Sequence, residues 1–248
     1  MTVEQMPNPG HTRWLDVGVE ASVPRRRTIV GLLALAEDRA VDAEVRGFLA
    51  SEDVDVQSSR VGMPVSLTLD GFREMETAFS RGASFLSRRC HVVAVGCASA
   101  AVALGPARLI QLVEAALPGV RVVEPIGAYL ASLANRSAGR IGLMTPYREE
   151  TNRALTHLFR ERGIEVAVGL RLRTPPGAVP SDVSPASIVD AVHRADLSGL
   201  EALVISCTAL RTAGLLTELE AQLGVPVITT NRALADALLR SLAESRER

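Results

Sequence analysis

Two short stretches, His91-Val-Val-Ala-Val-Gly-Cys97-Ala-Ser-Ala100 and Ala202-Leu-Val-Ile-Ser-Cys207-Thr-Ala-Leu210, decide the fold of this chain. Each is a run of β-branched and apolar residues that stops at a cysteine followed by small or hydroxylated residues. A short apolar run bounded in this way predicts a strand buried in a parallel sheet. The cysteine then lies at the carboxyl end of its strand, where open α/β sheets bind their ligands. Two thiols at equivalent points indicate one site that is built from two sides.

The two stretches belong to an internal repeat. Val30-Gly31-Leu32 matches Ile141-Gly142-Leu143 at a separation of 111 positions, and Cys97 matches Cys207 at 110 positions. Segments 117–123 and 223–228 match as well, and a fixed period of this kind indicates repeated structure. Strands and helices alternate in each copy, which predicts an α/β fold with two similar parallel-sheet lobes. A pseudo-two-fold axis would relate the lobes and place the active-site cleft between them.

We expect three parts along the chain. Residues 1–27, interrupted by prolines and a glycine, are expected to form a flexible tail. Residues 28–135 form the first lobe and 136–248 the second, whose C-terminal helix is expected to pack on the first. Apart from the two cysteine strands, strands are expected over 28–36, 54–61, 120–123, 140–145, 164–172 and 225–228. Helices are expected over 42–49, 70–85, 126–134 and 149–162, with others that begin near 106, 212 and 231.

Composition narrows the functional classes. A net charge of −1 and 3% aromatic residues do not favour nucleic-acid binding, which uses basic surfaces and stacking side chains. No run of about eighteen apolar residues occurs, so no membrane partner is expected. Three cysteines without a secretory leader are typical of a cytoplasmic protein. Neither a metal-ligand spacing nor a Gly-rich phosphate loop is present, so no metal and no cofactor is expected.

Paired thiols across a cleft suit reactions at carbon. One thiol can remove a proton from one face while the other returns a proton on the opposite face, or one can attack a carbon covalently. Helix N-termini lower thiol pKa values, so at least one of Cys97 and Cys207 is expected to have a lowered pKa. A buried cysteine can also serve only as a small hydrophobe. We expect that packing role for Cys90, which has no partner in the repeat, and expect it to react more slowly.

From Thr28 to its C-terminus, the chain resembles the aspartate/glutamate racemase superfamily, in particular its maleate isomerase and arylmalonate decarboxylase branch. The motifs that carry the resemblance are Gly96-Cys97-Ala98-Ser99, Thr145-Pro146-Tyr147 and Ser206-Cys207-Thr208. The chain is also similar to the racemase-like proteins encoded with ectoine breakdown. The resemblance implies a two-lobed, cofactor-independent enzyme that acts beside the carboxylate of a small acid, with a dicarboxylic acid expected. We also expect a homo-oligomer, namely a dimer.

The resemblance implies a role for individual residues. Cys97 would be the nucleophile or base of the first lobe, and Cys207 its partner in the second. Tyr147 would donate its hydroxyl to a substrate carboxylate, assisted by Ser99, Thr208 and nearby backbone N–H groups.

The chain also departs from its relatives at the expected substrate-binding positions. Ala98 stands where many relatives carry Thr or another polar residue after the first cysteine. Glu37-Asp38 stands where isomerases of maleate carry an Asn after the first strand. Asp38 is therefore expected to line the site, where an acidic side chain would repel a dianion.

Three functions compete. The first is an isomerase or racemase that uses Cys97 and Cys207 on a small carboxylic acid, as in maleate cis–trans isomerisation. The second is a decarboxylase of the arylmalonate type on the same scaffold, which the presence of both cysteines disfavours. The third is a binding protein whose cleft holds a small acid without turnover, a role that has no use for paired thiols.

Overall fold

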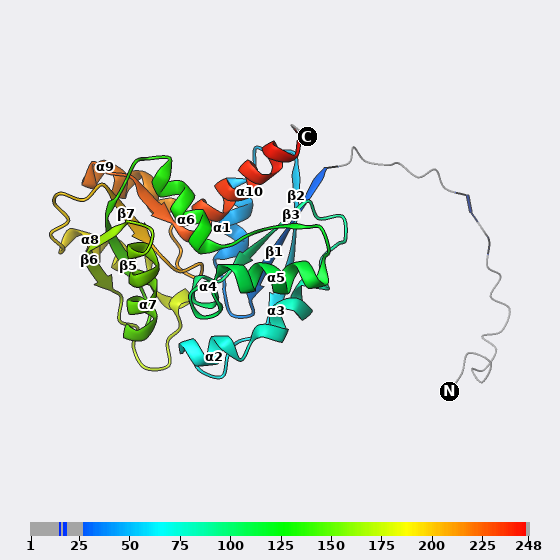
Figure 1. Ribbon diagram of the computed structural model, residues 1–248. Coiled ribbons are helices and arrows are strands. Elements are labelled where there is room, and N and C mark those ends of the chain that lie inside the picture. Colours follow the sequence, from blue (N-terminus) through cyan, green and yellow to red (C-terminus); the bar gives the residue numbers. More distant parts are fainter. Residues whose placement is uncertain (1–14, 16, 19–26, 247–248) are drawn as a thin grey trace.

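A computed structural model describes residues 15, 17, 18 and 27–246. Most of the expected tail over residues 1–27 therefore lies outside the described residues. The described chain is an α/β fold with two parallel sheets (Figure 1). The first half contains β1 (Thr28–Leu35), α1 (Val41–Phe48), β2 (Val54–Val61), α2 (Leu69–Arg73), α3 (Glu76–Ala83), β3 (Val92–Gly96), α4 (Ala98–Leu104), α5 (Pro106–Ala116), β4 (Arg121–Val123) and α6 (Pro125–Ala134).

The second half repeats this order of strands. It contains β5 (Arg140–Thr145), α7 (Glu149–Arg160), β6 (Glu165–Arg171), the 3₁₀ turn η2 (Pro180–Asp182), α8 (Pro185–His193), β7 (Ala202–Ile205), the 3₁₀ turn η3 (Ala213–Leu215), α9 (Leu216–Leu223), β8 (Val227–Thr229) and α10 (Thr230–Arg246). The sheets have the orders β2-β1-β3-β4 and β6-β5-β7-β8, and every strand pair is parallel. We call each sheet with its own helices a lobe. The predicted α/β class with two parallel sheets is confirmed.

A glycine at the same point of each lobe explains the matching Val-Gly-Leu and Ile-Gly-Leu segments. A Cβ atom on Gly31 in β1 would come within 2.8 Å of side-chain atoms of Leu86 and Val93. A Cβ atom on Gly142 in β5 would come within 2.8 Å of Leu200. Both central strands therefore need a residue without a side chain, because the covering segment lies directly on the sheet.

The predicted helix over 70–85 is in fact two helices. α2 ends at Arg73, and α3 begins at Glu76 after a turn at Met75. The turn changes the direction of the chain, so that Phe72, Met75 and Phe79 all enter one apolar cluster with Leu33. Tertiary packing here overrides the local helical pattern.

The two lobes share one apolar core. In Figure 1 the helices α1, α6 and α10 lie between the two sheets, and α10 contacts α1, α6 and β3 of the first lobe. Tyr129 of α6 is fully buried there and lies in the same cluster as Leu234 and Leu238 of α10. No helix within the described residues has the length and apolar character that a membrane crossing requires.

One carboxylate ties the lobes together. Glu44 on α1 accepts hydrogen bonds from the N–H of Thr212 at 2.5 Å and from its hydroxyl at 3.1 Å. It also accepts from the N–H of Ala213 at 2.9 Å and from the side-chain amide of Asn231 at 2.8 Å. All these donors belong to the second lobe, so one side chain of α1 fixes the position of η3 and of the start of α10.

Candidate functional site

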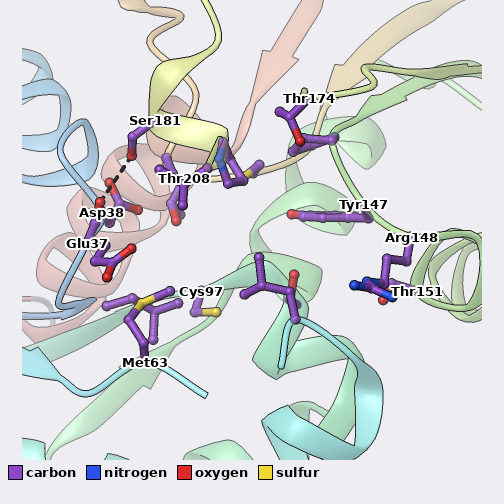
Figure 2. Close-up of a pocket in the computed structure, with 18 of the residues that line it drawn as sticks. Glu37, Asp38, Met63, Cys97, Tyr147, Arg148, Thr151, Thr174, Ser181 and Thr208 are labelled. Atoms are coloured by element: carbon purple, nitrogen blue, oxygen red, sulfur yellow. Dashed lines mark hydrogen bonds between the residues drawn. The ribbon is translucent and has the colours of Figure 1, made fainter. Parts of the chain in front are cut away.

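A cavity of about 490 Å³ lies between the lobes, at the carboxyl ends of the central strands. This is the place where parallel α/β sheets bind ligands. The structure brings all the site residues expected from the sequence to the lining of this one cavity; they are Asp38, Cys97, Ala98, Ser99, Tyr147, Cys207 and Thr208. Figure 2 shows Cys97 on one side of the cavity, with Tyr147 reaching toward its centre from the opposite side.

Cys97 lies at the junction of β3 and α4. It forms the N-cap of α4, and its Sγ accepts a hydrogen bond from the N–H of Ala100 at 3.4 Å. Burial raises the pKa of the Cys97 thiol to about 12; the Ala100 N–H opposes the rise and the Asp38 carboxylate adds to it. The thiol is therefore held in its protonated form near neutral pH.

Cys207 follows β7 at the equivalent place in the second lobe. Its N–H donates a hydrogen bond to Thr230 Oγ1 at 2.9 Å, which fixes the backbone at the start of the turn. Burial raises the pKa of the Cys207 thiol to about 12, and the Asp38 carboxylate adds to the rise. The Asp38 carboxylate therefore contributes to the raised pKa of both thiols.

The expectation of a lowered thiol pKa is wrong. The placement of Cys97 at a helix N-terminus was correct, but the loss of water around the sulfur outweighs the backbone N–H groups. Cys90 lies outside the cavity, buried in the core with Leu86, and burial raises its pKa to about 11. All three thiols are thus protonated near neutral pH, and one of the two cavity thiols must lose its proton before it can act as a base or nucleophile.

Tyr147 closes a chain of hydroxyl groups that runs between the lobes. Its hydroxyl lies 3.3 Å from Ser206 Oγ, which accepts a hydrogen bond from the Tyr129 hydroxyl at 2.9 Å. The Tyr129 hydroxyl in turn lies 2.5 Å from Thr230 Oγ1, the acceptor for the Cys207 N–H. Burial holds the pKa of Tyr147 well above its usual value, so its hydroxyl remains a hydrogen-bond donor at neutral pH.

Thr208 links the two cysteine segments directly. Its hydroxyl donates to the carbonyl of Gly96 at 3.1 Å, in the residue before Cys97. The hydroxyl proton is therefore already used within the protein, unlike the expectation that Thr208 donates to a carboxylate. Ala98 and Ser99 begin α4 directly after Cys97 and complete the first-lobe wall of the cavity.

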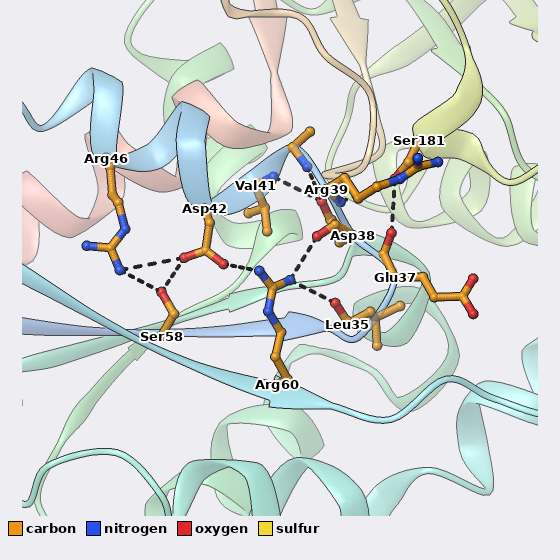
Figure 3. Close-up of polar contacts among 11 residues, drawn as sticks. Leu35, Glu37, Asp38, Arg39, Val41, Asp42, Arg46, Ser58, Arg60 and Ser181 are labelled. Atoms are coloured by element: carbon orange, nitrogen blue, oxygen red, sulfur yellow. Dashed lines mark hydrogen bonds and ion pairs between the residues drawn. The ribbon is translucent and has the colours of Figure 1, made fainter.

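Two loops reach across the cavity, one from each lobe. The loop after β2, residues 62–68, is tied to the second lobe where the N–H of Leu69 donates to the Glu150 carboxylate at 3.1 Å. The loop after β6 leads into η2, where the hydroxyl of Ser181 donates to the carbonyl of Glu37 at 3.2 Å (Figure 3). The N–H of Arg39 donates to Ser181 Oγ at 3.3 Å, so the second loop is held at two points of the first lobe.

Sequence reasoning missed the lining residues that these loops and the start of α7 supply. They include Met63, Leu67, Arg148, Thr174, Val179 and Ser181. The repeat offered one usable signal, because residues just after each predicted strand belong at the same edge of the sheet as the cysteines. Among the described residues, no group of three or more His, Cys, Asp or Glu side chains is placed to hold a metal ion.

The family model for arylmalonate decarboxylase matches residues 63–247. The chain belongs to this family, within the aspartate/glutamate racemase superfamily. Among curated proteins, the maleate isomerase of Pseudomonas putida (strain KT2440) is 30% identical over 122 residues, which are 49% of this chain and 49% of that protein. The chain therefore spans only about half the length of this curated relative.

Two solved structures share the fold over most of this chain. The maleate isomerase Iso from Pseudomonas putida S16 aligns with a TM-score of 0.79 and 22% identity, covering 87% of this chain and 93% of that chain. A maleate cis–trans isomerase of Nocardia farcinica aligns with a TM-score of 0.78 and 22% identity, over 87% of this chain and 93% of that chain. That structure is of a cysteine-to-serine mutant with a covalently bound succinylcysteine intermediate.

Proposed function

We propose that this protein is a cofactor-independent isomerase or racemase that acts on a small carboxylic acid with Cys97 and Cys207. The observation that carries the proposal is the meeting of two thiols, from equivalent strand ends of the two lobes, in one cavity with the Tyr147 hydroxyl. The maleate isomerases among the relatives, one of them with a cysteine-bound intermediate, support it.

The two thiols support two routes. In a proton-transfer route, one sulfur as thiolate removes a proton from the carbon beside the carboxylate, and the C–H electron pair moves toward the carboxyl group. The other thiol then gives its proton to the opposite face of that carbon, and the two sulfurs have exchanged roles. The Tyr147 hydroxyl would bind the carboxylate, on which negative charge develops.

In a covalent route, the Cys97 thiolate forms a bond to one carbon of a double bond. The π electron pair takes a proton from Cys207 at the neighbouring carbon, and the new single bond rotates. The Cys207 thiolate then removes that proton, the double bond re-forms, and the C–S pair returns to Cys97. The small side chain of Ala98, which lines the cavity beside Cys97, favours Cys97 as the nucleophile and Cys207 as the proton donor.

Proton–deuterium exchange tests the proposal. Purified protein is incubated in heavy water with a panel of small mono- and dicarboxylic acids, and incorporation of deuterium and change of configuration are followed by NMR. We expect exchange or isomerisation of at least one acid, and its loss in Cys97→Ser and Cys207→Ser. Release of CO₂ from a malonate without isomerisation would favour the decarboxylase, and binding without exchange would favour a binding protein.

A further inference from the structure

The charged side chains that line the cavity are divided between its two sides. Among the described lining residues, Glu37 and Asp38 are acidic and Arg148 is basic. Glu37 and Asp38 lie together on one side, and Arg148 lies beyond Tyr147 on the other (Figure 2). The cavity therefore has an acidic wall in the first lobe and a basic group in the second.

Asp38 is nearly fully buried, with only 5% of its surface exposed. Its Oδ1 accepts hydrogen bonds from the N–H groups of Ala40 and Val41, both at 2.9 Å. Within the described residues its Oδ2 has no hydrogen-bond donor and no ion-pair partner, although the residue lines the cavity. A buried carboxylate is costly unless it is paired, so this oxygen is suited to a partner that enters from the cavity.

Arg39, the next residue in the chain, and Arg60, which contacts the backbone of Asp38, both make their ion pairs with other carboxylates. Arg39 pairs with Asp182 of the second lobe. Arg60 pairs with Asp42 and donates to backbone carbonyls of Leu35 and Asp38, not to the Asp38 carboxylate (Figure 3). Within the part of the chain that the structure describes, neither arginine forms an ion pair with Glu37 or Asp38.

We propose that Asp38, together with Glu37, forms a subsite for a positively charged amino group, so that the substrate is an aminocarboxylic acid and not a dicarboxylic acid. This inference rests on the proposed function and specifies its substrate class. The carboxylate of such a ligand faces the Tyr147 hydroxyl and Arg148, and its ammonium group faces Asp38. The ligand's two opposite charges then match the two walls.

Asp38 lines the same cavity as both sulfurs, which gives this subsite a second effect. The Asp38 charge contributes to the raised pKa of Cys97 and of Cys207. An ammonium group bound to Asp38 offsets that charge and therefore favours loss of a thiol proton. The bound amine would make thiolate formation easier only when a ligand is in place.

Calorimetric titration of the full chain with matched acids tests the subsite without any turnover. The probes are three sets in which one group changes: β-alanine, butanoate and succinate; 4-aminobutanoate, pentanoate and glutarate; alanine, 2-methylpropanoate and methylmalonate. In at least one set we expect the amino acid to bind roughly tenfold or more tighter than its uncharged counterpart, and the diacid to bind more weakly still. Tighter binding of the uncharged acids or diacids, or no binding of any amino acid at millimolar concentration, would overturn the proposal.

Two variants locate the effect. Asp38→Asn keeps an oxygen for the Ala40 and Val41 N–H groups, and Glu37→Gln keeps the shape of its side chain. We expect Asp38→Asn to reduce the preference for the amino acid to near unity and Glu37→Gln to reduce it partly. Glu52→Gln, an exposed acid in the same lobe, should leave it unchanged. An unchanged preference in Asp38→Asn would contradict the subsite, and a general loss of affinity by all probes would mean a structural role only.

The failures of the two proposals can be told apart. If the protein binds amino acids but exchanges no proton in heavy water, the proposed isomerase or racemase activity fails while the subsite stands. If it exchanges protons of a dicarboxylic acid and rejects the amino acids, the subsite fails while the activity stands.

Discussion

Tyr129 and Tyr147 come from different lobes and meet at the same hydroxyl group. The Tyr129 hydroxyl donates to Ser206 Oγ at 2.9 Å, and the Tyr147 hydroxyl lies 3.3 Å from the same atom. Tyr129 is fully buried, whereas Tyr147 keeps 9% of its surface exposed and lines the cavity. One tyrosine therefore serves the core and the other can reach a ligand.

The same substitution should change activity at one of these tyrosines and stability at the other. Tyr147→Phe removes a donor to a substrate carboxylate and should lower kcat/KM by a factor equivalent to about 1–3 kcal/mol. Tyr129→Phe leaves the buried hydroxyls of Ser206 and Thr230 with one partner fewer, so it should lower the free energy of unfolding by about 1 kcal/mol or more. Kinetics and denaturant unfolding of both variants check this. An unchanged kcat/KM in Tyr147→Phe would assign that residue to packing.

The two cysteines should differ in the adducts they form. We expect Cys97→Ser and Cys207→Ser each to abolish isomerisation, because each route needs both sulfurs. Only Cys97→Ser should fail to form an adduct with an electrophilic substrate analogue that intact-mass spectrometry detects. If the wild type forms no adduct and each single variant still exchanges a proton of one enantiomer, the proton-transfer route holds. Full activity in Cys97→Ser would exclude the two-thiol mechanism.

The raised thiol pKa values predict slow alkylation near neutral pH. Burial raises the pKa of both Cys97 and Cys207 to about 12, so the reactive thiolate is a small fraction. The rate of modification by iodoacetamide should rise about tenfold per pH unit through the alkaline range while the fold persists. Peptide mapping by mass spectrometry identifies which cysteine has been modified. Fast, pH-independent labelling of either thiol at neutral pH would contradict the raised values.

The same shifts fix the sign of the pH effect on stability. A folded-state pKa of about 12 lies above that of an unfolded thiol, about 8.5, so the folded protein keeps its thiol protons longer. Their stabilising contribution is fully present below about pH 8.5 and is lost as the pH rises toward 12. Compared with wild type, a Cys97→Ser protein should lose less unfolding free energy over this alkaline window.

Glu44 should be important for the connection between the lobes. Glu44→Ala leaves donors of Thr212, Ala213 and Asn231 without their acceptor, so the free energy of unfolding should fall by roughly 2–4 kcal/mol. Glu52→Ala, at an exposed position in the same lobe, is the control and should change it by about 0.5 kcal/mol or less. Equal stability of the two variants would show that the Glu44 hydrogen bonds do not stabilise the connection between the lobes.

The repeated glycines make a prediction about both central strands. Gly31→Ala and Gly142→Ala should each destabilise the fold by about 1–3 kcal/mol, because the new methyl group meets side chains at 2.8 Å. Gly169→Ala in β6 has nothing within 4 Å of the added atom and is the matched control. Thermal unfolding measures all three; a harmless Gly31→Ala would contradict the close approach of Leu86 and Val93.

Much of this architecture could be predicted because its signals are local. The apolar runs that end at Cys97 and Cys207 predict buried strands, and their repetition predicts two sheets of one design. That the two thiols line one cavity follows from a rule about strand ends, which needs no knowledge of side-chain packing. The separation of α2 from α3 was not predictable in this way, because the turn at Met75 serves a cluster assembled from distant strands.

The electrostatics of the site was also not predictable, for a related reason. Helix N-termini are visible in a sequence, but the burial that raises the thiol pKa values arises only when both lobes close around them. Likewise, the sequence shows Arg39 next to Asp38 without showing that Arg39 pairs with Asp182, and the approach of Arg60 to this segment arises only in the folded structure. The loop between β6 and η2 has no periodic pattern of apolar residues, so the sequence does not predict which of its side chains line the cavity.

The equal strand order of the two sheets has a stereochemical consequence. A ligand turned end for end would still face the ends of equally ordered strands, but it would meet Glu37 and Asp38 where it had met Arg148. The charge distribution of the cavity is therefore asymmetric, although the two sheets have the same strand order. In the proposed proton-transfer route, each prochiral face of a bound carbon would be assigned to one sulfur, and the forward and reverse half-reactions would take place in unequal surroundings.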